Sequence, residues 1–161
     1  MPGPVRPSPI AGSWYPGYPD ILKGDIGAYL DHASIPEIPA RPVAIISPHA
    51  GYVYSGPVAA HAYKTLMGYD YSTVVVISPS HRAYFPFISI WGDGAYETPL
   101  GQVPVDEELC TALVKSSTFI REEKRPHLAE HALEIQLPFL QVVLKLFKLC
   151  PVIMGQQEIN L

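Results

Sequence analysis

Two histidines that each follow a hydrophobic run give the strongest indication of chemistry in this sequence. The runs at residues 43–47 (VAIIS) and 73–78 (TVVVIS) are followed closely by His49 and His81. Continuous apolar runs of this length are typical of strands that are buried on both faces of a parallel sheet. Neighbouring parallel strands lie about 5 Å apart, and ligands bind outside their carboxyl ends. His49 and His81 are therefore candidate ligands of one metal ion, and the alternative is that each histidine only caps its loop.

A second pair of histidines lies in the sequence HLAEH, which begins at His127 and ends at His131. The spacing matches the H-x-x-E-H pattern of inverted zincins and would place both rings on one face of a helix. Such a peptidase needs a further acidic ligand far downstream, and only residues 132–161 follow. We predict instead that His131 or His127 lines the same pocket as an acid–base catalytic group. The structural alternative is a buried helix histidine paired with Glu130 or Glu134.

Four aromatic residues are candidates for contact with a bound substrate. Trp14 and Tyr15 stand together in an N-terminal segment rich in proline and glycine, where adjacent aromatic residues indicate an ordered loop. Tyr52 and Tyr54 lie in a loop punctuated by glycine, directly after His49. Their hydroxyl groups could donate hydrogen bonds to a ligand, and the alternative is that these side chains simply pack.

The composition excludes several classes of protein. The chain has 161 residues, of which 48% are hydrophobic and 16% charged, so it is long and apolar enough to bury a core. A net charge of −4 without a basic cluster argues against binding to nucleic acid. No apolar run approaches the roughly 18 residues that a membrane span needs. The two cysteines form no Cys-x-x-Cys motif and no signal-peptide pattern is present, so we expect a cytoplasmic protein with reduced thiols.

The hydrophobic patterns predict one α/β domain over residues 1–161, with a mostly parallel central sheet flanked by helices. Strands are expected at residues 43–47, 73–78, 87–91 and 149–154. Helices are expected at residues 19–33, 57–67, 106–116 and 126–147. Pro57 would occupy the first position of the second helix. Pro138 would kink or divide the last helix.

A series of motifs along the chain resembles the Memo family. The motifs are residues 11–16 (AGSWYP), 47–52 (SPHAGY), 54–56 (YSG), 78–81 (SPSH), 96–101 (YETPLG), 130–140 (EHALEIQLPFL) and 151–155 (PVIMG). They occur in the family's order and span most of the chain. Members of this family run to nearly twice this length, so the resemblance implies a domain that is incomplete at its C-terminus.

The resemblance also implies a fold like that of the class III extradiol non-haem iron dioxygenases. In that fold His49 and His81 would be the first two ligands of a divalent transition metal, with iron expected first and copper or zinc as alternatives. The family's further site residues come from a later Ser-Ser-Asp-x-x-His segment and a later cysteine, and this sequence contains neither.

From these features we expect a metal-binding, dioxygenase-like oxidoreductase whose activity would require more than this chain alone. The alternatives are a module that binds a peptide or small molecule without chemistry, and a truncated family member without activity. An incomplete sheet leaves an unpaired edge or an apolar surface. We therefore expect a homo-oligomer, or a partner chain that supplies the missing half; a monomer in light scattering would count against self-association.

Overall fold

The computed structural model describes residues 3–157 of the chain. In chain order the elements are β1 (Val5–Arg6), α1 (Pro19–His32), α2 (Tyr52–Lys64), β2 (Thr73–Pro79), β3 (Ile88–Ile90), β4 (Ala95–Thr98), β5 (Gly101–Pro104), α3 (Glu107–Ser116), β6 (Ile120–Glu122), α4 (Arg125–Leu128), the 3-10 helix η1 (Glu134–Gln136), α5 (Leu137–Val143) and β7 (Lys148–Met154). None of the helices within this described range is long and apolar enough to cross a membrane.

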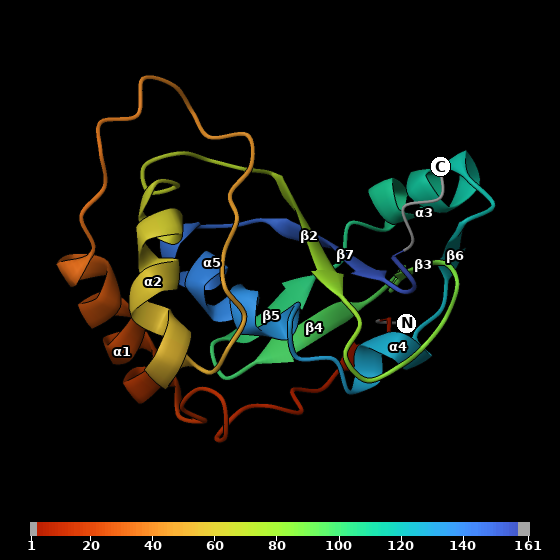
Figure 1. Cartoon of the computed structure of the whole chain (residues 1–161), viewed down its shortest axis with the longest axis horizontal. Helices are drawn as coiled ribbons and strands as arrows, with labels where there is room; N and C mark the ends of the chain where they lie inside the picture. Colours follow the sequence, from red (N-terminus) through yellow and green to blue (C-terminus); the bar gives the residue numbers. More distant parts are fainter. Residues whose placement is uncertain (1–2, 158–161) are drawn as a thin grey trace.

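Two mixed sheets form the centre of the fold. The larger sheet has the strand order β2-β7-β3-β6, and the smaller one has the order β1-β4-β5. Strands β2 and β7 are parallel over seven residue pairs, whereas β3 is antiparallel to β7 and parallel to β6. Figure 1 shows α1, α2 and α5 grouped on one side of the β2–β7 pair, with α3 near β6 on the other. The α/β class is thus confirmed, and the larger sheet is mixed, with two parallel strand pairings and one antiparallel pairing.

The prediction of a buried strand at residues 43–47 is wrong. This segment has no regular secondary structure and pairs with no strand among residues 3–157, and Val43 and Ile46 are 100% and 97% exposed. A hydrophobic run becomes a strand only where a neighbouring strand supplies hydrogen-bond partners for its backbone. The described part of the chain places no such neighbour beside it.

Two predicted helices differ from the observed ones. Helix α2 begins at Tyr52, so Pro57 lies inside it and not at its first position. The predicted helix at residues 126–147 is divided into α4, η1 and α5, with an irregular bend at residues 129–133 and Pro138 in the first turn of α5. Proline is favoured in a first turn because its missing N–H has no helical acceptor there.

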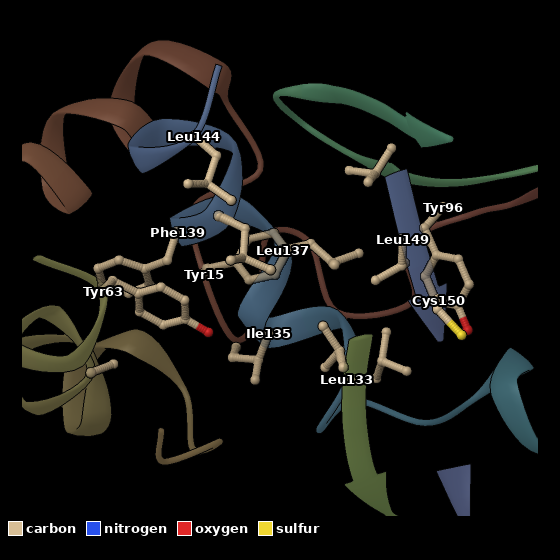
Figure 2. Close-up of a cluster of buried hydrophobic side chains, with 14 of the residues drawn as sticks. Tyr15, Tyr63, Tyr96, Leu133, Ile135, Leu137, Phe139, Leu144, Leu149 and Cys150 are labelled. Carbon is tan, nitrogen blue, oxygen red and sulfur yellow. The ribbon is translucent and has the colours of Figure 1, made fainter. Parts of the chain in front are cut away.

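The hydrophobic core lies between the helices and the larger sheet. Figure 2 shows side chains of α5, including Leu137 and Phe139, meeting Tyr63 of α2 on one side of the cluster, while Leu149 and Cys150 of β7 lie on the other. The rings of Tyr63 and Phe139 are stacked with their centroids 4.9 Å apart. This packing fixes α5, and with it the bend that precedes η1 and α5.

A buried arginine joins the N-terminal strand to the same bend. The guanidinium group of Arg6 donates to a carboxylate oxygen of Glu134 at 2.5 Å. It also donates to the backbone oxygens of His127 at 2.7 Å and Glu130 at 2.6 Å. Both charged side chains are almost completely buried. Because removing one partner of a buried ion pair leaves the other charge without compensation, this contact is expected to govern how the bend is held.

We expect Arg6→Ala to lower the free energy of unfolding by about 3–5 kcal/mol, because Glu134 would keep a buried charge without its cation. Urea-induced unfolding followed by circular dichroism measures the change. The exposed Arg125→Ala is the matched control and should change stability by no more than about 0.5 kcal/mol. Equal effects of the two substitutions would contradict a stabilising role for the Arg6 contacts.

Candidate metal centre

Three histidines from separate parts of the chain meet at one place. His49 precedes α2, His81 follows β2, and His131 lies in the bend after α4. One ligand nitrogen from each ring lies within 4.8 Å of the other two. The ring centroids of His81 and His131 are 4.6 Å apart, and those of His49 and His81 are 5.1 Å apart. We call these three residues the histidine group; they could hold a metal ion.

The spacing of the histidine group suits a single ion after side-chain rotations. Metal–imidazole bonds of about 2.0–2.1 Å allow two nitrogens on one ion to be separated by at most about 4.2 Å. Three ligands of a tetrahedral ion lie closer together, at about 3.4 Å, so nitrogens within 4.8 Å of one another would have to approach by up to about 1.4 Å. Three protein ligands with an open fourth position are the usual arrangement of a catalytic site, whereas closed four-ligand sites are structural.

Glu130 organises two members of the histidine group from behind. Its buried carboxylate accepts hydrogen bonds from the backbone N–H of His81 at 2.6 Å and from Nδ1 of the same ring at 3.0 Å. It also accepts from the backbone N–H groups of His131 and Ala132, both at 2.9 Å. Burial raises the pKa of Glu130, but these hydrogen bonds outweigh it and hold the pKa below the ordinary value.

The contact with Glu130 sets the tautomer of His81. A carboxylate only accepts hydrogen bonds, so Nδ1 of His81 must carry the proton. The lone pair of the neutral ring is then on Nε2, which is free to bind a metal. Carboxylate–histidine pairs of this kind fix the ring orientation in known metal sites and make the histidine a stronger ligand.

His131 is the most buried member of the group, and its ring packs against Trp14 with centroids 4.2 Å apart. Its Nδ1 is buried without a hydrogen-bond partner and lies 3.4 Å from a carboxylate oxygen of Glu130. Burial lowers the pKa of His131, and the negative charge of Glu130 opposes this effect. Burying a ring nitrogen without a hydrogen bond costs free energy of folding. A bound metal ion would offset this cost if the nitrogen were one of its ligands.

His127 lies apart from the histidine group. It is fully buried, with Tyr96 Oη 2.5 Å from its Nδ1 and Ser89 Oγ 3.1 Å from its Nε2. Burial, helped by the nearby positive charge of Arg6, lowers the pKa of His127 to about 3. This ring is therefore neutral at physiological pH, and both of its nitrogens are already engaged.

The predicted substrate contacts are divided between the core and the surface. Trp14 lies beside the histidine group, where it covers His131. Tyr15 and Tyr52 are buried, and their hydroxyl groups donate to Glu134 at 2.6 Å and to the backbone oxygen of Ile135 at 2.9 Å. Tyr54 faces solvent on α2. Among the four, only Trp14 touches a residue of the histidine group.

An apolar cavity of about 460 Å³ opens beside His49. Its lining includes residues 42–47, the residues of β2, Gln136 and Leu140. Its volume is within the usual range for small-molecule pockets. The histidine group thus has packed protein behind it at Glu130 and Trp14, and open space beside His49.

Sequence reasoning assigned no role to Arg6 and named Glu130 only as a partner for a neighbouring histidine. Glu130 does contact the neighbouring His131, and it also binds His81, which is 49 residues away along the chain. The motif HLAEH singled out the right segment, since it contains both Glu130 and His131. No pattern in the sequence indicated the buried contact between Arg6 and Glu134, which are 128 residues apart.

The fold and the site define an α/β protein with a three-histidine group that could hold a metal ion. A family model described as "Memo-like protein" matches residues 6–161, and the chain belongs to this family. Curated relatives named MEMO1 family protein are 41% identical in Thermotoga neapolitana, 38% in Sulfolobus acidocaldarius and 37% in Thermoplasma volcanium. These matches cover 96%, 95% and 96% of this chain and 59%, 58% and 57% of the relatives. The chain therefore spans slightly more than half the length of these curated relatives.

We expect Glu130→Gln to destabilise the fold by about 1–3 kcal/mol. The NH₂ group of the glutamine side chain would face N–H donors that bond to the carboxylate of Glu130, and those donors would lose their acceptor. The same change should release the fixed tautomer of His81. Urea-induced unfolding measures the first effect, and the ¹⁵N chemical shifts of the His81 ring measure the second.

The exposed Glu97→Gln, on β4, is the control for the loss of one negative charge. It should leave both stability and the His81 ring shifts unchanged. If His81 keeps its proton on Nδ1 in Glu130→Gln, the carboxylate does not set the tautomer.

Proposed function

We propose that this chain binds one divalent transition-metal ion through His49, His81 and His131. The observation that supports the proposal most directly is the convergence of three ring nitrogens within 4.8 Å of one another. The chemistry of the donor set agrees with it, since neutral imidazole binds iron, copper and zinc. The buried Nδ1 of His131, which has no hydrogen-bond partner, and the fixed tautomer of His81 are further support.

Each residue around the histidine group has a distinct part in this proposal. Glu130 orients His81 and holds the backbone of His131, while Trp14 excludes water from the back of His131. His49 faces the cavity, where a substrate or another ligand would enter. We assign His127 to holding the bend in place, through its backbone oxygen on Arg6. The acid–base roles predicted for His131 and His127 stay predictions.

The proposed reaction class is oxidation by a mononuclear non-haem metal site of the dioxygenase type, and it rests on the family's resemblance to the extradiol enzymes. A bound iron(II) ion would supply Lewis-acid and redox chemistry at the open side of the group. Iron is proposed first, with copper and zinc as the alternatives. The natural substrate would be an aromatic or redox-active small molecule held in the cavity beside His49.

The first test is the metal content of protein purified anaerobically and without a tag. Elemental analysis should find about one transition-metal ion per chain. The double variant His49→Ala/His81→Ala should contain none, and His131→Ala should weaken binding by more than the roughly 10–100-fold typical of lost outer-shell partners. The exposed His32→Ala is the control, since its ring bonds to the backbone oxygen of Ala28 within its own helix.

Equal metal content in the wild type and the double variant would overturn the proposal. A complete absence of metal from both would favour a module that binds a peptide or small molecule without chemistry. If iron is found, incubation of the iron-loaded protein with catechols under oxygen tests the dioxygenase assignment, and ring opening is followed by its absorbance change.

A further inference from the structure

The two cysteines of the chain lie against each other in the core. Cys110 belongs to α3 and Cys150 to β7, and they are 40 positions apart in the sequence. Their sulfur atoms are 3.6 Å apart, and both side chains are completely buried. Cys150 is one of the core side chains drawn in Figure 2. Because the sequence contains only these two cysteines, the fold brings together every thiol that it has.

Backbone hydrogen bonds hold the two cysteines in this relation. The N–H of Asp106 donates to the oxygen of Leu149, the residue directly before Cys150, at 2.9 Å. One helical turn later, the N–H of Cys110 donates to the oxygen of Asp106, also at 2.9 Å. The side chain of Asp106 caps α3 and accepts from Thr73 Oγ1 on β2 at 2.5 Å. The first turn of α3 is thus fixed to the sheet beside Cys150.

We propose that Cys110 and Cys150 form a reversible disulfide bond that ties α3 to β7. An S–S bond of about 2.05 Å requires the two sulfurs, which are 3.6 Å apart, to approach by about 1.5 Å. Rotation about the Cα–Cβ bond of each cysteine moves its sulfur without moving the backbone. The fold therefore holds the thiols at a distance from which the bond closes by local side-chain movement.

The bond forms by exchange with a low-molecular-weight disulfide of the glutathione class. The thiolate of one cysteine attacks a sulfur of the small disulfide, which forms a mixed disulfide and releases one small thiolate. The thiolate of the other cysteine then attacks the protein sulfur of the mixed disulfide and releases the second small thiolate. The two cysteines give up two electrons and two protons, and the small disulfide becomes two small thiols.

Burial makes the bond slow to form and slow to reduce in the folded chain. Exchange requires a small disulfide or thiol to reach one of the sulfurs, and neither cysteine has exposed surface. Oxidation therefore takes place while the chain folds or opens locally. After the core has closed, the same burial shields the bond from reductants.

The surroundings favour an uncharged disulfide over a metal ion held by two thiolates. The contact with Cys150 and burial raise the pKa of the Cys110 thiol, and the negative charges of Asp106 and Glu122 add to this effect. Two thiolates would place further negative charge in the core. Among the described residues, the histidine group is the only cluster that could hold an ion, so no further ligand joins the cysteines. A disulfide removes both ionisable groups.

The loop that the bond closes contains the bend of the candidate metal centre. Between Cys110 and Cys150 lie β6, α4, the bend at residues 129–133, η1 and α5. A cross-link restricts the unfolded conformations of this segment, so it stabilises the folded bend that carries Glu130 and His131. The cysteines lie outside the histidine group, so the proposal does not depend on a bound metal.

Refolding in a glutathione redox buffer tests the proposal. The wild type is unfolded in urea and refolded with oxidised and reduced glutathione, and its remaining thiols are then alkylated in denaturant. The intact mass should be about 2 Da below that of the reduced, unalkylated chain, because the disulfide leaves no thiol to alkylate. Peptide mapping should find Cys110 joined to Cys150. The same chain refolded with dithiothreitol is the reduced control and should be alkylated at both cysteines.

The thermal midpoint of unfolding supplies a second measurement. The oxidised wild type should unfold about 5–15 °C above the reduced wild type, as expected for a cross-link that closes a loop of this length. Cys110→Ala and Cys150→Ala are the matched controls, and their midpoints should not depend on the oxidant. Dithiothreitol should reduce the oxidised folded chain at least about tenfold more slowly than the same chain in urea, because the bond is buried.

Two alkylated cysteines after oxidative refolding would overturn the proposal, as would a cross-link found only between two chains. A bond between Cys110 and Cys150 that lowers the midpoint would also overturn it, because the bond would then be incompatible with the packing of α3 on β7. If both alanine variants fail to fold, the alkylation and the peptide map of the wild type still decide between these outcomes.

Discussion

The carboxylate of Glu130 is buried behind the histidine group and accepts from four N–H donors. Three are the backbone N–H groups of His81, His131 and Ala132, and the fourth is the Nδ1 of the His81 ring. A buried charge of this kind is tolerated only when its acceptor positions are filled, so the donors must come to it. That requirement pulls the loop after β2 and the bend after α4 toward each other. His81 and His131 are neighbours because both belong to the donors that Glu130 collects.

Arg6 extends this polar centre through the fold to the opposite side of the bend. It contacts the backbone of His127 and Glu130 and the carboxylate of Glu134, which in turn accepts from Ser8 and Tyr15. The bend is thus held by charged side chains instead of by regular secondary structure. Arg6 and Glu134 bind it on one side, and the carboxylate of Glu130 binds it on the other. Low-dielectric surroundings make such a network rigid when every member is satisfied.

The sequence predicted the elements that depend on local pattern and missed those that depend on distant contacts. Strand β2 and the position of His81 at its end followed from a hydrophobic run, and His49 and His81 do lie together. The run at residues 43–47 has the same pattern but forms no strand, since pairing is decided by a neighbour and not by composition. His127 and His131 were expected on one helix face. Arg6 instead donates to the backbone oxygens of His127 and Glu130, and the Glu130 carboxylate accepts from the backbone N–H groups of His131 and Ala132, so these groups bond outside a helix. Arg6 is far from this segment in the sequence, and no local pattern predicts its contacts.

The contact between Arg6 and Glu134 also sets an order of events during synthesis. The two residues are separated by 128 positions, so the arginine leaves the ribosome long before its carboxylate exists. At about 5–20 residues per second, the delay is on the order of 6–26 s. His49 and His81 are likewise made well before the segment that holds them in place. A nascent chain therefore exposes two unorganised imidazoles for seconds, and their final geometry appears only when the bend arrives.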